Sequence, residues 1–253
     1  MASGSGHSFL GTSGWSYNHW RGSFYPDDVP QSRWFEYYSQ HFHSVELNSS
    51  FYRIPAASTV VSWLRRSPPN FVFCVKVSRL ITHTKQLTNC EGECNYFFTI
   101  FKPLRDKTGA FLVQVPPSVR FHPALLRDFL CQVPDDIPVV MEFRHGSWYN
   151  DTTYTILSEN NALFCIHDMK LIETPRIVTG SAVYIRFHGC FGVSAGNYPQ
   201  TILFDWATWI EEQRSIGKTV YAYFNNDING YAVENCRQLQ SMLTMEELRP
   251  KGD

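Results

Sequence analysis

One segment near the C-terminal end of the chain joins a strand, a polar turn and a helix, and this pattern limits the possible folds. Residues 220–225 alternate between two faces, as the side chains of a β-strand do. The turn from Asn226 to Gly230 is rich in Asn and Asp, and helical spacing then runs from Ala232 to Leu243. A strand that ends in a polar turn and continues as a helix is a βα unit. In barrels and open α/β sheets, functional residues gather at this turn.

The same unit recurs along the whole chain, whose 253 residues match the ~250 of a typical (β/α)8 barrel. We therefore predict an α/β protein with a single (β/α)8 TIM barrel at residues 9–253, after a flexible leader at 1–8. Segment 169–181 has no helical period, so the sixth helix should be short or missing. A doubly wound sheet is the alternative, but no G-x-G-x-x-G motif follows an early strand. The predicted strands are 9–13, 43–47, 71–77, 110–115, 137–143, 163–166, 182–187 and 219–224. The other predicted helices are 32–40, 59–66, 96–104, 123–131, 153–160 and 204–216.

Polar residues fall on one face of the predicted strands and near one end. The opposite face stays apolar to its end, as expected of a side that packs against helices. In a closed parallel barrel the polar face lines the interior, and its C-terminal ends converge where barrel enzymes keep their sites. The converging residues are Glu46, Lys76, Gln114, Glu142, Arg186 and Tyr223.

An inert ion network is the structural alternative to a functional pocket. Glu46 and Glu142 would then neutralise Lys76 and Arg186 without any chemistry. Burying four charges is costly, however, and apolar replacements are often equally stable. Polar residues at one end of six strands therefore favour a functional pocket.

Composition excludes some classes of function. The net charge of −1 provides no overall basic field of the kind that many nucleic-acid-binding proteins carry, although a local patch is compatible with it. No stretch approaches the ~18 apolar residues of a membrane span, and the first residues lack the features of a signal peptide. We expect a cytoplasmic protein with no membrane partner.

The seven cysteines support an intracellular location. Four lie inside apolar runs, which predicts reduced thiols in the core. Cys90 and Cys94 form a C-x₃-C pair without a second pair at zinc-finger spacing, so we expect solvated loop thiols. The four predicted core cysteines are Cys74, Cys131, Cys165 and Cys236.

Six motifs occur in a fixed order along the chain. They are GTSGWSY at 11–17, VELNSSFY at 45–52, FCVKVS at 73–78, EFRHGSW at 142–148, YIRFHG at 184–189 and YFNND at 223–227. With these motifs the sequence resembles the DUF72 (YecE-like) family over about residues 9–243. The resemblance implies a TIM barrel. A remote likeness of that family to endonuclease IV and xylose isomerase-like barrels suggests nucleic-acid or sugar-phosphate chemistry.

A divalent metal is one alternative for the site, because suitable ligands lie at or just beyond the strand ends. The sequence has no H-x-H or H-E-x-x-H motif, and Lys76 and Arg186 would disfavour a neighbouring metal ion. We therefore expect no metal and no other cofactor. The candidate ligands are His83, His145, His167, His188, Glu46, Glu142, Asp168 and Asp227.

Two covalent chemistries are further alternatives. Lys76 could form a Schiff base if burial lowered its pKa, but nearby carboxylates should keep it charged. Glu46 and Glu142 could act as the carboxylate pair of a glycosidase. Aromatic residues that could stack on sugar rings or bases, or anchor loops instead, are Trp15, Trp20 and Trp148.

Anion binding fits these residues best, because Lys and Arg beside Asn and Gln are suitable donors for phosphate or carboxylate. We predict an enzyme that acts on a phosphorylated or other anionic small molecule, or on a nucleic-acid end, by general acid/base chemistry. A non-catalytic anion or nucleic-acid binding protein is the alternative. Glu46 or Glu142 would be the base, and His188 or His145 the acid. The predicted catalytic residues are Glu46, Lys76, Glu142, Arg186 and His188. The predicted substrate-binding residues are Asn48, Gln114, Arg144, His145, Trp148, Tyr223, Asn225, Asn226 and Asp227.

Overall fold

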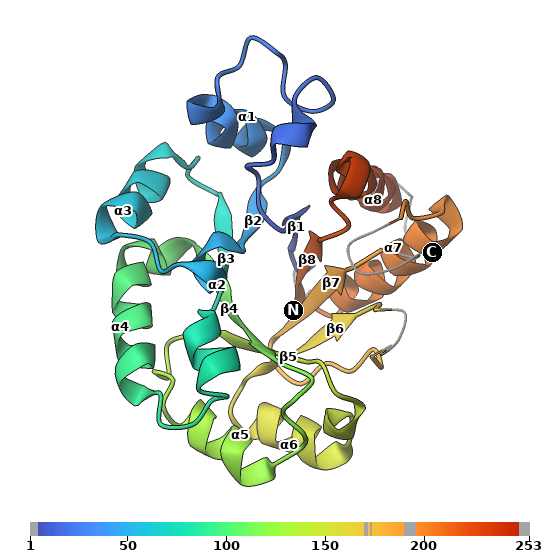
Figure 1. Cartoon of the computed structure of the whole chain (residues 1–253). Coiled ribbons are helices and arrows are strands. Elements are labelled where there is room, and N and C mark those ends of the chain that lie inside the picture. Colours follow the sequence, from blue (N-terminus) through green and yellow to red (C-terminus); the bar gives the residue numbers. More distant parts are fainter. Residues whose placement is uncertain (1–4, 170–171, 173, 190–195, 248–253) are drawn as a thin grey trace.

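Eight parallel strands curl into a barrel that helices surround (Figure 1). The computed structural model describes residues 5–169, 172, 174–189 and 196–247. The strand order is β1-β8-β7-β6-β5-β4-β3-β2, so β2 to β8 follow one another as in the chain and β1 lies beside β8. This arrangement confirms the predicted TIM barrel. The strands are β1 (Ser8–Thr12), β2 (Ser44–Leu47), β3 (Val72–Lys76), β4 (Thr108–Val115), β5 (Val139–Phe143), β6 (Leu163–His167), β7 (Ala182–Phe187) and β8 (Thr219–Phe224).

The helices cover the outside of the barrel, with α3 and α4 on one side of the view and α7 and α8 on the other (Figure 1). The described residues between β6 and β7 contain no helix, in agreement with the short or missing sixth helix. The third predicted helix begins earlier than expected, at Glu91, because Glu91 and Glu93 favour a first helical turn. The helices are α1 (Trp34–His41), α2 (Ser49–Tyr52), α3 (Ala57–Arg66), α4 (Glu91–Phe101), α5 (Pro123–Leu130), α6 (Asp151–Glu159), α7 (Gln200–Ser215) and α8 (Tyr231–Glu247).

The inside of the barrel is built in layers. Its apolar layers contain side chains of alternate strand positions, as the period of two requires. The predicted charged layer also lies inside, toward the C-terminal ends, where Gln114 pairs in register with Glu142 and His167 pairs with Arg186. A larger apolar core separates the strands from the helices. The apolar interior residues are Cys74, Ala110, Leu112, Val140, Leu163, Cys165, Tyr184 and Tyr223.

A tyrosine joins the two ends of the sheet, β1 and β2. The Tyr38 hydroxyl accepts a hydrogen bond from the Thr12 backbone N–H (2.9 Å) and donates one to the Ser44 carbonyl (3.0 Å). The strands approach closely at Gly11, where an added Cβ would lie 2.1 Å from the Ser44 carbonyl oxygen. A glycine and one hydroxyl group from α1 therefore close the barrel.

Removing this hydroxyl should destabilise the protein. We expect Tyr38→Phe to lower the free energy of unfolding by about 1–3 kcal/mol, because it leaves a buried donor and a buried acceptor unpaired. Urea unfolding measures the change. Tyr37→Phe is the control, since Tyr37 lies on the same helix and is only half-buried. An equal loss of stability in both variants would contradict the bridging role of Tyr38.

The structure corrects three expectations about cysteines. Cys90 and Cys94 are buried rather than solvated, with their Sγ atoms 3.8 Å apart. The early start of α4 turns both thiols toward the core. Cys131 is exposed, because it follows the last turn of α5 instead of facing the core.

The N-terminal residues contact the barrel from Gly6 onward, before the predicted start of the domain at residue 9. The Gly6 backbone N–H donates to the Arg214 carbonyl (2.8 Å), and the Val220 N–H donates to the His7 carbonyl (2.8 Å). Strand β1 begins at Ser8, inside the segment predicted as leader. In the part of the chain that the structure describes, no helix has the length and apolar character that crossing a bilayer requires.

Candidate functional site

A cavity of about 630 Å³ opens at the C-terminal end of the barrel; we call it the mouth cavity. It brings together seven of the predicted site residues, which come from six different strands or the turns after them. Five further residues of its wall were not among the predicted catalytic or substrate-binding residues, although His83 was named as a possible metal ligand. The predicted residues in the wall are Asn48, Lys76, Gln114, Arg144, Arg186, His188 and Asn225. The additional ones are Tyr17, Phe51, Tyr52, Arg79 and His83.

Arg186 lines the cavity and is held there by Glu46. Its Nε and Nη2 atoms donate to the two carboxylate oxygens of Glu46 at 2.9 and 2.7 Å. Ser13 Oγ and the Tyr184 hydroxyl donate to the same oxygens at 2.7 and 2.8 Å. Glu46 is 0% exposed, and both of its oxygens are occupied. Glu46 therefore holds Arg186 in place, and it does not line the cavity.

Glu142 lies beside the same guanidinium group. It accepts a hydrogen bond from Arg186 Nη1 at 2.8 Å, and Arg144 Nη2 lies 2.5 Å from its other oxygen. Burial alone would raise the pKa of Glu142, but Arg144 and Arg186 outweigh it and hold this pKa well below its usual range. Such a carboxylate is a weak base. Glu46 and Glu142 also share one arginine and are 0% exposed, so they do not flank a substrate as a glycosidase pair does.

His188 is a neutral imidazole in the cavity wall. Asn225 Nδ2 lies 3.2 Å from its Nδ1 and Arg144 Nη2 lies 3.3 Å from its Nε2. Burial lowers the pKa of His188 to about 3, and the charges of Arg186 and Arg144 act in the same direction. His188 is therefore uncharged near neutral pH and is a poor choice for the predicted general acid.

The pKa of Lys76 is lower than the sequence led us to expect. Lys76 is 8% exposed, and its Nζ lies 4.2 Å from the centre of the Phe51 ring. Burial and the nearby Arg186 lower the pKa of Lys76 to about 8, and Glu142 and Glu46 offset this only in part. The carboxylates were expected to keep Lys76 charged, but they are bound to arginines instead.

The charges around the cavity leave a positive excess. Glu46 and Glu142 balance Arg186 and Arg144. Within the described residues, no ion pair includes Lys76 or the exposed Arg79. Lys76 and Arg79 therefore provide the positive charge available to a ligand.

Two predicted binding residues face away from the cavity. Trp148 is fully buried, stacks on Phe143 with ring centres 4.5 Å apart, and lies on the helix side of β5. Asn226 is also buried, and its Nδ2 donates to Asn235 Oδ1 on α8 at 2.8 Å. Both follow strand ends, where the alternation of a strand no longer fixes the direction of the side chain.

Three other predicted binding residues do not line the cavity. The Tyr223 hydroxyl is 2.5 Å from Ser44 Oγ, inside the barrel. Asp227 accepts a hydrogen bond from Trp20 Nε1 at 2.7 Å, so it anchors the loop after β1. His145 accepts a backbone hydrogen bond from the turn that follows it. The structure gives each of them a contact with another part of the chain and places none of them in the wall of the cavity.

The donor set does not form a metal site where the structure describes the chain. No three His, Cys, Asp or Glu side chains lie together as ligands there. The carboxylates nearest the cavity, Glu46 and Glu142, are bound to guanidinium groups, so their oxygens are not free to coordinate an ion.

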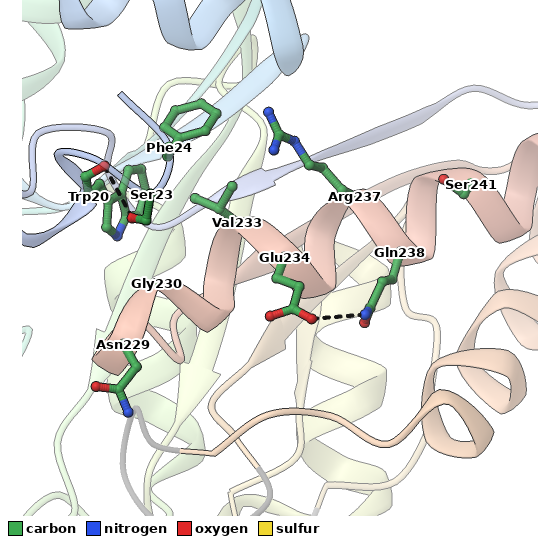
Figure 2. Close-up of a pocket in the computed structure, with 10 residues that line it drawn as sticks. All are labelled: Trp20, Ser23, Phe24, Asn229, Gly230, Val233, Glu234, Arg237, Gln238 and Ser241. Atoms are coloured by element: carbon green, nitrogen blue, oxygen red, sulfur yellow. Dashed lines mark hydrogen bonds between the residues drawn. The ribbon is translucent and has the colours of Figure 1, made fainter. Parts of the chain in front are cut away.

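A groove outside the barrel is a second hollow, of about 420 Å³, between the loop after β1 and α8 (Figure 2). Arg237 points toward Phe24, with the guanidinium carbon 5.1 Å from the ring centre. On the other side of the groove, Gln238 donates to Glu234 at 3.2 Å. The charges of Arg237 and Glu234 balance. Trp20, a possible stacking residue, lines this groove, but none of the predicted catalytic or substrate-binding residues does, so the mouth cavity is the candidate site.

Comparisons with known proteins agree with the fold. The profile of a family described as "Protein of unknown function DUF72" matches residues 9–252. The UPF0759 protein YunF of Bacillus subtilis is 28% identical over 274 residues, covering 94% of this chain and 95% of YunF. The UPF0759 protein YecE of Escherichia coli K12 is 31% identical over 116 residues, covering 45% of this chain and 42% of YecE.

Solved structures show the same architecture. The crystal structure of a DUF72 family protein from Thermotoga maritima superposes with a TM-score of 0.85 at 30% identity, covering 94% of this chain and 99% of the other. A DUF72 family protein from Enterococcus faecalis gives a TM-score of 0.81 at 24% identity, covering 97% and 99%. The first likeness extends to sequence and fold, and the second shows the fold alone.

Proposed function

The chain belongs to the DUF72 family of proteins of unknown function, and from the mouth cavity we propose that it is an enzyme acting on an anionic substrate. The substrate is a phosphorylated or other anionic small molecule, or a nucleic-acid end. One observation carries this proposal: two cations without a carboxylate partner line the cavity beside ion pairs whose charges cancel.

Three cationic side chains give the cavity its chemistry. Lys76 supplies a point charge at the end of β3, and Arg79 supplies a planar fork from the turn that follows. Arg144 adds a third donor group, because its Nε is buried without a hydrogen-bond partner among the described residues. Charged donors of this kind bind phosphate and carboxylate oxygens through short, strong hydrogen bonds.

In the proposed reaction, Lys76 transfers the proton. A group whose pKa of about 8 lies near the working pH can both accept and release a proton. His188, whose pKa is lowered to about 3, stays uncharged and takes part only in hydrogen bonds at the cavity wall. Glu46 and Glu142 hold Arg186 and Arg144 in place. This division of roles replaces the predicted one, in which the glutamates were bases.

Turnover distinguishes the enzyme from a binding protein. Purified protein is incubated with phosphorylated sugars, mononucleotides and a 5′-phosphorylated oligonucleotide, and the products are measured by mass spectrometry. Product formation that Lys76→Met abolishes and Lys102→Met retains would support the enzyme, since Lys102 is exposed before β4, at the opposite end of the barrel. Tight binding with no product would identify a binding protein.

Anion affinity should fall as the pH rises above about 8. The pKa of Lys76 is lowered from 10.5 to about 8, so the folded protein loses this positive charge above that pH. Sulfate is the probe, because its own charge stays constant, and isothermal titration calorimetry gives the affinity. Lys76→Arg should keep its affinity over the same range, because arginine stays charged. An equal fall in Lys76→Arg would assign the titration to another group.

A further inference from the structure

A smaller side pocket of about 230 Å³ lies beside the mouth cavity. Tyr17, Asn48 and Tyr52 line both cavities, so the two share a wall. The side pocket also contains Trp15 and Leu47, and none of its lining residues is charged. A charged cavity beside an uncharged aromatic one fits a ligand with a charged group at one end and a flat, weakly polar group at the other.

The aromatic wall of the side pocket is held rigidly. The centre of the Trp15 ring lies 4.9 Å from that of Phe35 and 5.9 Å from that of Trp63, which it meets edge-on. The Tyr17 ring lies 4.9 Å from Trp20, and its hydroxyl donates to the Ser13 carbonyl at 2.5 Å. Fixed rings lose little conformational freedom when a ligand packs against them, which favours binding.

Tyr52 is an exposed ring at the shared edge. It is 74% exposed, although its neighbour Phe51 is buried beside Lys76. Short helix α2 therefore places one aromatic ring against the cationic group and the next at the rim of both cavities. An exposed ring next to a positive cavity provides a surface on which a planar ligand group can stack.

Asn48 provides a polar contact between the two cavities. Its Oδ1 is buried and has no hydrogen-bond partner among the described residues, and its Nδ2 lies 3.4 Å from the Ser13 carbonyl. Leaving a buried acceptor unpaired costs free energy, so a ligand that donates a hydrogen bond there gains affinity. This favours a ring with N–H groups over a hydrocarbon ring.

We propose that the ligand of the mouth cavity is a nucleotide, with its phosphate beside Lys76 and Arg79 and its base in the side pocket against Tyr17 and Tyr52. This inference rests on the proposed anionic substrate and specifies its class. The nucleotide is either a free mononucleotide or the terminal nucleotide of a nucleic acid, since both present the same phosphate and base.

Calorimetric titrations with matched ligands test the role of the base. Adenosine 5′-monophosphate should bind about five- to a hundredfold more tightly than ribose 5-phosphate, which has the phosphate but no ring. Tyr52→Ala should reduce this preference, because it should weaken the binding of adenosine 5′-monophosphate more than that of ribose 5-phosphate. Tyr96→Ala is the matched control, because Tyr96 is a 58% exposed tyrosine on helix α4.

The outcomes separate this inference from the proposed function. Equal affinities for the two phosphates would overturn the nucleotide assignment while leaving anion binding intact. If neither phosphate bound, the proposed function would fail and the inference with it. A 5′-phosphorylated trinucleotide that bound more tightly than both the mononucleotide and its unphosphorylated form would identify a nucleic-acid end. Equal binding of trinucleotide and mononucleotide would identify the free nucleotide.

Discussion

Arg186→Met should lower the free energy of unfolding by about 3–5 kcal/mol, as breaking a buried ion pair from one side does. Arg186 is almost fully buried and neutralises Glu46 and Glu142, both inaccessible to solvent. Methionine fills much of the space but leaves two carboxylates without their shared cation. The melting temperature should therefore fall by roughly 10 °C.

The control for Arg186 is an arginine in a surface ion pair. Arg127 contacts Glu159 at 2.9 Å, and both side chains are about half exposed. Arg127→Met should change stability by less than about 1 kcal/mol, because solvent screens such pairs. Adding Glu46→Gln to Arg186→Met should recover part of the lost stability by removing one unpaired charge. If Arg186→Met were no less stable than Arg127→Met, Arg186 would not be balancing the glutamates.

Lys76→Met should weaken binding of a phosphorylated ligand by about ten- to a hundredfold, since a charged hydrogen bond is lost. Its effect on stability should be opposite to that of Arg186→Met. Burial already disfavours the charged form of Lys76, as its lowered pKa shows, so methionine removes a cost. A melting temperature equal to that of the wild type or higher, together with weaker binding, would show that Lys76 contributes to ligand binding and not to stability.

Lys102→Met is the control for the change in net charge. Lys102 is exposed at the opposite end of the barrel, so its loss should leave ligand affinity within about twofold of the wild type at moderate ionic strength. If both lysine variants lost affinity equally, the attraction would come from the overall charge rather than from the mouth cavity. If neither did, Lys76 would have no part in binding.

The period of the strands made part of the site predictable. Side chains two residues apart share a face, so the polar ends of β2, β3, β5 and β7 could be assigned to the barrel interior, and Glu46, Lys76, Glu142 and Arg186 lie there. The motifs resembling the DUF72 family pointed to the same barrel. The barrel could therefore be predicted from the sequence, but the ends of several helices and the short helix α2 (Ser49–Tyr52) could not.

The pairing of these charges could not be predicted. Arg186 meets Glu46 across the barrel, a contact that depends on the closure of the barrel and not on spacing along the chain. Lys76 has no carboxylate partner among the described residues because both glutamates pair with arginines. Arg79 and Tyr52 lie in turns and a short helix after strands, where no period fixes a direction, so they were missed. Trp148 was assigned to the site for the same reason and is buried instead.

The most direct test of an anion-binding mouth is to locate a bound anion in crystals. Selenate is a suitable ligand, because it resembles sulfate and its anomalous scattering identifies it without ambiguity. We predict a selenate site inside the mouth cavity, within hydrogen-bond distance of Lys76 and Arg79, that is lost in Lys76→Met crystals grown in the same way. Selenate bound only elsewhere on the protein, with the mouth cavity free of it in the wild type, would contradict the proposed function.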